Sequence, residues 1–185
     1  MLFRSFAKLG ADVRDIELPE VRFSATTLTV IAAAEISAYH RRWLAERARD
    51  YGADVRRRLY LGATISASEY LLAQRSRRLI ATGLRRALGE VDVLAAPTAP
   101  GPAPRIADGA AAIQDRALEV GMHHTNLVRL PSLLGLPTIS VPCGWSQAGL
   151  PLGLQLVSRP FDEGAILTAA RAWEETTGSA RRPML

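Results

Sequence analysis

Cysteine and lysine are nearly absent from the sequence. Cys143 is the only cysteine and Lys8 the only lysine among 185 residues. Because one cysteine cannot form a disulfide within the chain, a disulfide framework is excluded. We therefore expect a reducing compartment, the cytoplasm.

Long hydrophobic runs are also absent. No window holds the roughly 20 consecutive apolar residues that a membrane helix requires, and the opening MLFRSFAKLGADV is charged too early for a secretory signal. We therefore expect no membrane partner. The hydrophobic fraction of 48% still allows a sizeable core, and we expect residues 1–185 to form a single segment.

The positive charge raises the question of nucleic-acid binding. The net charge is +5, and arginine clusters occur at residues 56–58 and 77–78. Few aromatic residues lie between these clusters, and no recognition motif accompanies them. Solvated helix faces explain arginines scattered among carboxylates better, so we expect no nucleic-acid partner.

Three segments have the apolar spacing of helices. The first covers residues 25–47, and its expected buried stripe is Leu28, Ile31, Ala32, Ile36, Tyr39 and Trp43. The second begins at a capping box, Ser66 to Glu69, and is expected to end at Gly89 in a left-handed conformation. Its expected buried side is Leu72, Leu79, Ile80, Leu84 and Leu88. The last begins at residues 162–163, ends at Gly178, and is expected to bury Ile166, Ala169, Ala170 and Trp173.

Strand patterns alternate with these helices, which predicts an α/β fold. We expect strands over residues 11–18, 91–96, 138–141 and 152–157, and a weak helix over residues 110–120. Two GLP triplets, at Gly135 and Gly149, are expected to turn the chain into a strand. The last three strands are apolar on both faces or nearly so, which predicts a sheet covered on both sides.

The stretch GLPTISVPCG, residues 135–144, contains Ser140 and Cys143 and could be a nucleophile loop or the end of a buried strand. A nucleophile needs a base and, in most cases, backbone donors at a helix N-terminus. Here prolines border the apolar TISV, and no helix pattern follows Gly144. We therefore predict that Cys143 is a small buried side chain of the framework.

With its surroundings, this stretch resembles a known family. LLGLPTISVPCGWSQAGLPLGLQLVSRPFDEGAILTAARAWEETTG is similar to the C-terminal signature of the amidase signature family. Upstream, VDVLAAPTAPGPAP, VRRRLYLGATISASEYLLAQRSRR and LFRSFAKLGADVRDIELPE resemble further segments of that family. The resemblance covers nearly all of the chain. It implies an α/β fold that is part of the family's mixed β-sheet, covered by helices on both faces.

The resemblance also implies a chemistry. Family members hydrolyse linear carboxamides with a Ser–cis-Ser–Lys triad, whose nucleophile lies in a Gly/Ser-rich loop that forms the oxyanion hole. This sequence has no Gly-Ser-Ser-Gly stretch and no adjacent serines, and Lys8 falls in the pattern of the helix after the nucleophile. We therefore expect a C-terminal portion of an amidase-signature domain that holds no catalytic residue and is inactive alone.

Three candidate substrate-binding residues follow from the same resemblance. The amidotransferase A subunits of this family present an arginine to the carboxylate of glutamine from a V-x-R-R-x-x-L-G stretch, and Arg58 is the matching residue here. Thr125 stands where those subunits place an aspartate, and Ser132 where many members have asparagine. Both departures leave the substrate open, and a solvated Arg58 is the alternative.

Other chemical groups favour structure over function. His123 and His124 are adjacent and have no partner at ligand spacing, so we expect no metal site and no cofactor. Glu35 lies on an apolar stripe, where a general acid or base is possible, but pairing with Arg75 or Arg78 is the better expectation.

Two interpretations of the whole chain remain open. In the first, an N-terminal amidase half or self-association completes the sheet and the cleft for a small amide. In the second, the chain is a non-catalytic binding or assembly module that keeps the family fold and is completed by a partner chain. An autonomous hydrolase that uses Cys143 or a serine is disfavoured.

Overall fold

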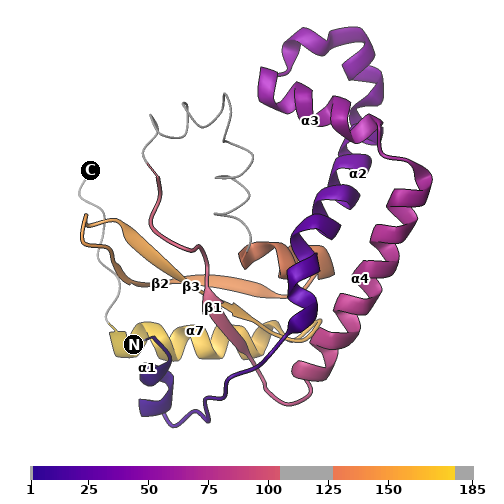
Figure 1. Cartoon of the computed structure of the whole chain (residues 1–185). Helices are drawn as coiled ribbons and strands as arrows, with labels where there is room; N and C mark the ends of the chain where they lie inside the picture. Colours follow the sequence, from indigo (N-terminus) through magenta and orange to yellow (C-terminus); the bar gives the residue numbers. More distant parts are fainter. Residues whose placement is uncertain (1, 105–126, 178–185) are drawn as a thin grey trace. The chain divides into compact units, whose positions relative to one another are not determined.

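The structure is a computed structural model that describes residues 2–104 and 127–177. The chain divides into two compact units, which we describe separately: a helical unit of residues 19–82 and a sheet unit of residues 1–18 and 83–185. Figure 1 shows their elements. The predicted weak helix over residues 110–120 and the predicted helix end at Gly178 lie outside the described residues.

The helical unit is built from two long helices and a short one. Its elements are η1 (Pro19–Phe23), α2 (Ser24–Arg47), η2 (Ala48–Asp50), α3 (Ala53–Ala63) and most of α4 (Ala67–Ala87). The predicted helix over residues 25–47 is confirmed as α2. Its predicted buried stripe is right for Ile31 and wrong for Ile36, Tyr39 and Trp43, which are exposed. Tyr39 is 72% exposed, and the buried residues of α2 are Ser24, Thr27, Ile31, Ser37 and Leu44.

A close approach between α3 and α2 explains why α2 buries small residues. A Cβ built on Gly62 of α3 would lie 2.1 Å from the carbonyl oxygen of Ala33 and 2.9 Å from Cβ of Ser37. Only small side chains fit where two helix backbones come this near. The bulky Tyr39 and Trp43 are therefore on the exposed side of α2.

The start of α4 agrees with the predicted capping box. The backbone N–H of Ser66 donates to Oε2 of Glu69 (2.7 Å), and the N–H of Glu69 donates to Oγ of Ser66 (3.2 Å). Hydrogen bonds from the backbone and hydroxyl of Ser66 lower the pKa of Glu69.

The predicted left-handed conformation of Gly89, after the end of α4, is wrong, because its φ is not positive. The N–H of Gly89 instead donates to the carbonyl of Arg85 at 3.0 Å.

Three of the five residues predicted for the buried side of α4 are buried. Ile80, Leu84 and Leu88 are buried, but Leu72 and Leu79 are 62% and 69% exposed. Ala73, one residue after Leu72, is buried although it was not predicted, and Ile80 follows Leu79 in the same way. One residue turns a helix by about 100°, so the buried side of α4 includes Ala73 and excludes Leu72 and Leu79.

In the sheet unit, the described residues form three antiparallel strands in the order β1-β3-β2. They are β1 (Leu94–Pro97), β2 (Thr138–Trp145) and β3 (Pro151–Val157). The predicted strands over residues 138–141 and 152–157 are confirmed, and the one over residues 91–96 begins later than expected. The strand predicted over residues 11–18 is wrong, because this segment pairs with none of the described strands.

Both GLP triplets act as predicted. Gly135 has a φ of 65° and Gly149 a φ of 75°, a conformation that glycine adopts at little cost. Each lies immediately before a Leu-Pro pair that leads into β2 or β3. The triplets therefore set where β2 and β3 begin.

The core of the sheet unit lies between the sheet and α7 (Glu163–Thr177). Its buried members are Val141, Leu154, Leu156, Ile166, Ala170 and Trp173. The predicted buried stripe of this helix is confirmed, with Ala169 only partly buried. Trp173 Nε1 donates to the carbonyl of Pro142 in β2 (2.9 Å). The ring centroids of Trp173 and of Phe6 in α1 (Leu2–Lys8) lie 5.0 Å apart.

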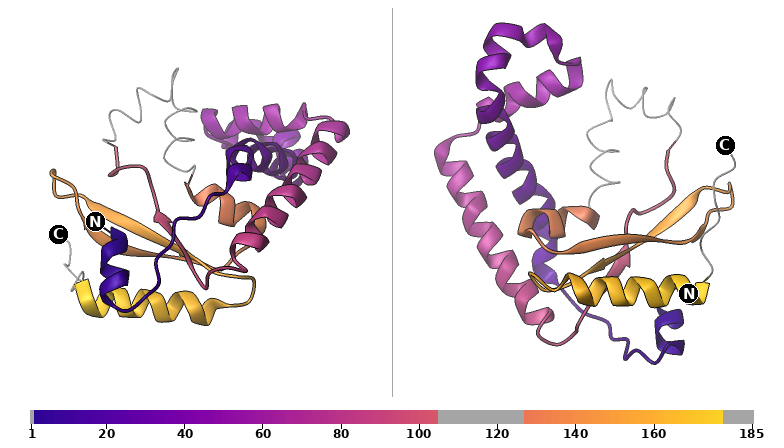
Figure 2. Two further views of the ribbon diagram at one scale, coloured as in Figure 1. Left: turned by 60° about the horizontal axis from the view of Figure 1, so that its bottom comes forward. Right: turned by 180° about the vertical axis from the view of Figure 1, so that it is seen from behind.

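The other face of the sheet is partly covered and partly polar. Figure 2 shows α7 on one side of the strands and the short helix at residues 127–134 on the other. Gln155 is buried on this second face, and Thr138 and Ser140 are exposed. The prediction of strands apolar on both faces is therefore wrong for β2. The α/β fold class is confirmed by the structural relatives reported below.

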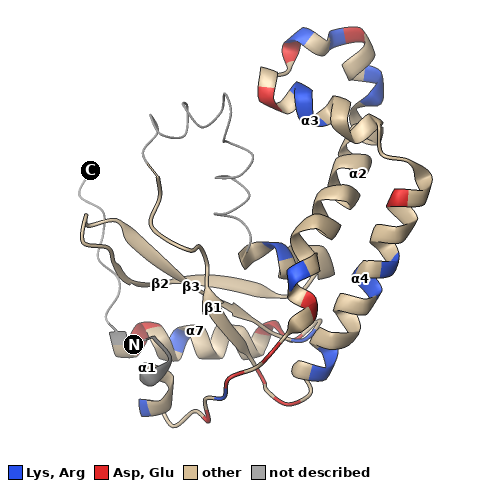
Figure 3. Ribbon diagram, viewed as in Figure 1, with Lys and Arg blue, Asp and Glu red and all other residues tan. Residues whose placement is uncertain are grey.

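Charge is mixed over the described surface. Figure 3 shows Lys and Arg interleaved with Asp and Glu around α3 and the end of α2, and exposed pairs such as Arg42–Glu46 and Arg47–Asp50 join them. None of the described helices is both long and apolar enough to cross a membrane.

Candidate functional site

The stretch that holds Ser140 and Cys143 is a strand of the framework. Cys143 packs against the core that faces α7, as do Ile139 and Val141. Burial raises the pKa of the Cys143 thiol. An activated thiol nucleophile needs the opposite shift, because the thiolate is the reactive form. The position of Cys143 and the raised pKa of its thiol therefore support a framework residue, but Cys143 is partly buried and not fully buried as predicted.

Ser140 belongs to a small polar cluster on the opposite face. Its Oγ lies 2.6 Å from Oγ1 of Thr98, above Gly153, where a Cβ would come within 2.8 Å of Oγ1 of Thr98 and 2.9 Å of Oγ of Ser140. The neighbouring Gln155, paired with Ser140 across the ladder, donates from Nε2 to the carbonyl of Leu127 (3.2 Å). Its Oε1 is buried and accepts no hydrogen bond from the described residues.

This cluster of Thr98, Ser140, Gly153 and Gln155 was missed by sequence reasoning. The only available signal was the alternation of polar and apolar residues in β3, which puts Gly153 and Gln155 on one face. Two hydroxyls and an amide can hold a polar group in place. They contain no acid or base that titrates near neutral pH, so the cluster alone does not perform proton transfer.

Arg58 lies on α3, and its exposed side chain has solvent access. Its neighbour Arg56 is different, because Arg56 Nη1 donates to the carbonyls of Ala48 (3.2 Å) and Tyr51 (3.4 Å). Arg56 thus ties η2 to α3, whereas Arg58 is exposed. Arg57 is also exposed, so exposure alone does not distinguish Arg58 from Arg57.

For the other two candidate residues, Ser132 and Thr125, the structure says less about substrate binding. Ser132 is exposed, and its hydroxyl donates to the carbonyl of Val128 one turn earlier in the helix at residues 127–134 (2.8 Å). Thr125 lies outside the described residues. Arg58 and Ser132 belong to different units, so their common role in one site stays a prediction.

Glu35 has a different partner from the one expected. The hydroxyl of Tyr70 in α4 donates to Oε1 of Glu35 at 2.8 Å, and Gln74 Nε2 donates to the Tyr70 oxygen (2.9 Å). The predicted pairing of Glu35 with Arg75 or Arg78 is therefore wrong. Glu35 joins α2 to α4 through a phenol, which satisfies a carboxylate without bringing a second charge.

The last two features are a surface hollow and the groups that could bind a metal ion. A shallow hollow of about 250 Å³ at the end of α2 is lined by Trp43, Arg47, Asp50 and Tyr51, and the Arg47–Asp50 ion pair already joins its charges. Among the described residues, no group of three or more His, Cys, Asp or Glu could hold a metal ion. His123 and His124 lie outside those residues.

Comparisons with known proteins identify the family. The family profile described as Amidase matches residues 2–167. The glutamyl-tRNA(Gln) amidotransferase A subunit of Myxococcus xanthus is 36% identical over 204 residues, an alignment that covers 97% of this chain and 41% of that protein. An amidase of Pseudomonas putida is 37% identical over 180 residues, which cover 96% of this chain and 38% of that enzyme.

A solved structure gives the same result. The glutamyl-tRNA(Gln) amidotransferase A subunit of Thermotoga maritima superposes with a TM-score of 0.70 at 31% identity, over 93% of this chain and 36% of that one. The chain spans about two fifths of the length of the curated relatives it matches. With the profile matching most of its residues, the chain belongs to the amidase signature family.

Proposed function

We propose that this chain is the C-terminal portion of an amidase-signature hydrolase that acts on linear carboxamides. It would supply framework and one wall of the substrate cleft and would be inactive alone. The observation that carries the proposal is the alignment, which covers nearly all of this chain but only about two fifths of its relatives.

The side chains of the sheet unit support inactivity in isolation. Amide hydrolysis requires a nucleophile, a base within hydrogen-bond reach and donors for the oxyanion. The thiol of Cys143 faces the core with a raised pKa, and the hydroxyl of Ser140 bonds to another hydroxyl, that of Thr98. Neither residue has the activated form that the reaction needs.

The first prediction concerns activity. The purified chain is expected to hydrolyse no aryl amide above the buffer rate, because a positioned nucleophile and base account for several orders of magnitude in rate. A fusion protein, in which this chain follows the part of the Pseudomonas putida amidase that it does not match, is expected to hydrolyse the same amide. Release of the arylamine is followed by absorbance.

Two results would contradict this proposal. One is turnover by the isolated chain that Cys143→Ala or Ser140→Ala abolishes, which would make the chain an autonomous hydrolase. The other is a fusion protein that does not fold. That result would favour the alternative, a non-catalytic binding or assembly module, for which the exposed aromatic side of α2 (Tyr39 and Trp43) would be a contact surface.

The second prediction concerns Arg58 in the active fusion protein. Arg58→Lys is expected to lower kcat/KM for a carboxylate-bearing amide by about ten- to a hundredfold, because an ammonium cannot make the two parallel hydrogen bonds of a guanidinium. A neutral amide is expected to be unaffected. Arg57→Lys, the exposed neighbour on α3, is the matched control and is expected to change neither substrate. An equal effect of Arg58→Lys on both amides would place Arg58 outside the cleft.

A further inference from the structure

The turn between β3 and α7 contains an aromatic residue in an unfavourable position. Phe161 has a φ of 62°, and among the described residues no other non-glycine residue has a positive φ. It is also 95% exposed, more than any other large hydrophobic residue in the described part of the chain. The backbone conformation is costly for a phenylalanine, and the exposed ring contributes no burial that would compensate for it.

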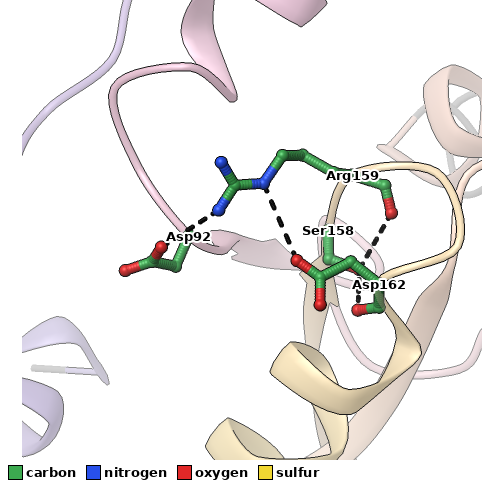
Figure 4. A network of polar contacts seen from close by, with 4 residues as sticks. All are labelled: Asp92, Ser158, Arg159 and Asp162. Carbon is green, nitrogen blue, oxygen red and sulfur yellow. Dashed lines mark hydrogen bonds and ion pairs between the residues drawn. The ribbon is translucent and has the colours of Figure 1, made fainter.

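Polar contacts hold this turn on both sides of Phe161. The hydroxyl of the buried Ser158 donates to the carbonyl of Asp162 (2.7 Å), and the N–H of Asp162 donates to the carbonyl of Arg159 (3.1 Å). The guanidinium of Arg159 lies between two carboxylates, 3.1 Å from Asp92 and 3.7 Å from Asp162. Figure 4 shows this network.

The network also joins the turn to the end of the sheet. Asp92 precedes β1, and the N–H of Ser158 donates to the carbonyl of Pro137 before β2 (3.2 Å). The turn is therefore braced by segments that lead into two other strands. Glycine or asparagine would adopt the same left-handed conformation at lower cost. A strained residue in such a braced turn indicates a function, in which burial of the exposed ring against a partner compensates for the strain.

We propose that Phe161 is a docking residue, which inserts into an apolar pocket on the part of an amidase-signature protein that this chain does not contain. This inference rests on the function proposed above. We assign the pocket to that part because the relatives extend far beyond the segment that this chain matches. A large surface of the same fold is therefore available to receive the ring. A single projecting ring suits a concave apolar surface.

The third prediction tests the strain in the isolated chain. Phe161→Asn is expected to raise the folding equilibrium constant by about fivefold, because asparagine tolerates a positive φ. Phe161→Ala keeps a Cβ at the same φ and removes the ring, so it is expected to leave the constant unchanged. Urea unfolding followed by circular dichroism measures both. Loss of stability in Phe161→Asn would overturn the proposal, because the turn would then favour phenylalanine without a partner.

The fusion protein tests the docking itself. Phe161→Ala is expected to lower its thermal midpoint by on the order of 3 °C and to leave the isolated chain unchanged, and Phe161→Leu is expected to keep most of the wild-type midpoint. If the fusion is active and Phe161→Ala has no effect on its midpoint, the docking inference is wrong and the proposed function stands. If the fusion does not fold, the proposed function is wrong. The docking inference is then wrong as well, because no amidase part receives the ring.

Discussion

Gly62→Ala is expected to lower the free energy of unfolding by about 3 kcal/mol. The new Cβ would lie 2.1 Å from the carbonyl oxygen of Ala33 and 2.8 Å from its carbon, and both atoms belong to the backbone of α2. A backbone cannot turn aside as a side chain can, so α3 would have to move away from α2. Alanine favours a helix by about 1 kcal/mol over glycine, and the clash outweighs this gain.

Urea unfolding followed by circular dichroism at helical wavelengths measures the effect. Gly164→Ala is the matched control: Gly164 also lies in a helix, α7, and a Cβ there meets no atom within 4 Å. That variant is expected to be neutral or more stable by about 0.5–1 kcal/mol. A Gly62→Ala protein as stable as the wild type would show that α2 and α3 are not closely packed in solution.

Trp173→Ala is expected to lower the free energy of unfolding by about 3–5 kcal/mol. The indole is buried among Val141, Leu154 and Ile166, so its removal leaves a cavity between the sheet and α7. It also removes the donor to the carbonyl of Pro142, which lies in the bulged part of β2. The loss of this hydrogen bond adds to the cost of the cavity.

Two further variants separate these contributions. Trp173→Phe keeps a phenyl ring but loses the N–H donor and part of the buried ring volume, so a loss of about 1–2 kcal/mol is expected. Leu167→Ala removes a 56% exposed side chain from the same helix and is expected to change stability by no more than about 0.5 kcal/mol. Denaturant unfolding of the four proteins gives the comparison. Equal losses in Trp173→Ala and Leu167→Ala would contradict the assignment of the core.

The candidate site was only partly predictable. The resemblance pointed to Arg58 on an exposed side of α3, and Cys143 was correctly placed in the framework. The Thr98–Ser140 contact joins residues 42 positions apart. A contact between two single hydroxyls so distant in sequence leaves no periodic signal, so only the paired strands reveal it.

The sequence by itself determined the family, the capping box at Ser66, the two GLP turns and the strands and helix of the C-terminal part. These features depend on residues that are close in sequence, where a turn residue or an alternation sets the local backbone. Tertiary structure alone decided which side of α2 is buried, the partner of Glu35 and the strained, exposed position of Phe161. Each of these depends on contacts with another element, as when Gly62 of α3 admits only small residues of α2, and hydrophobic spacing within one helix does not contain that information.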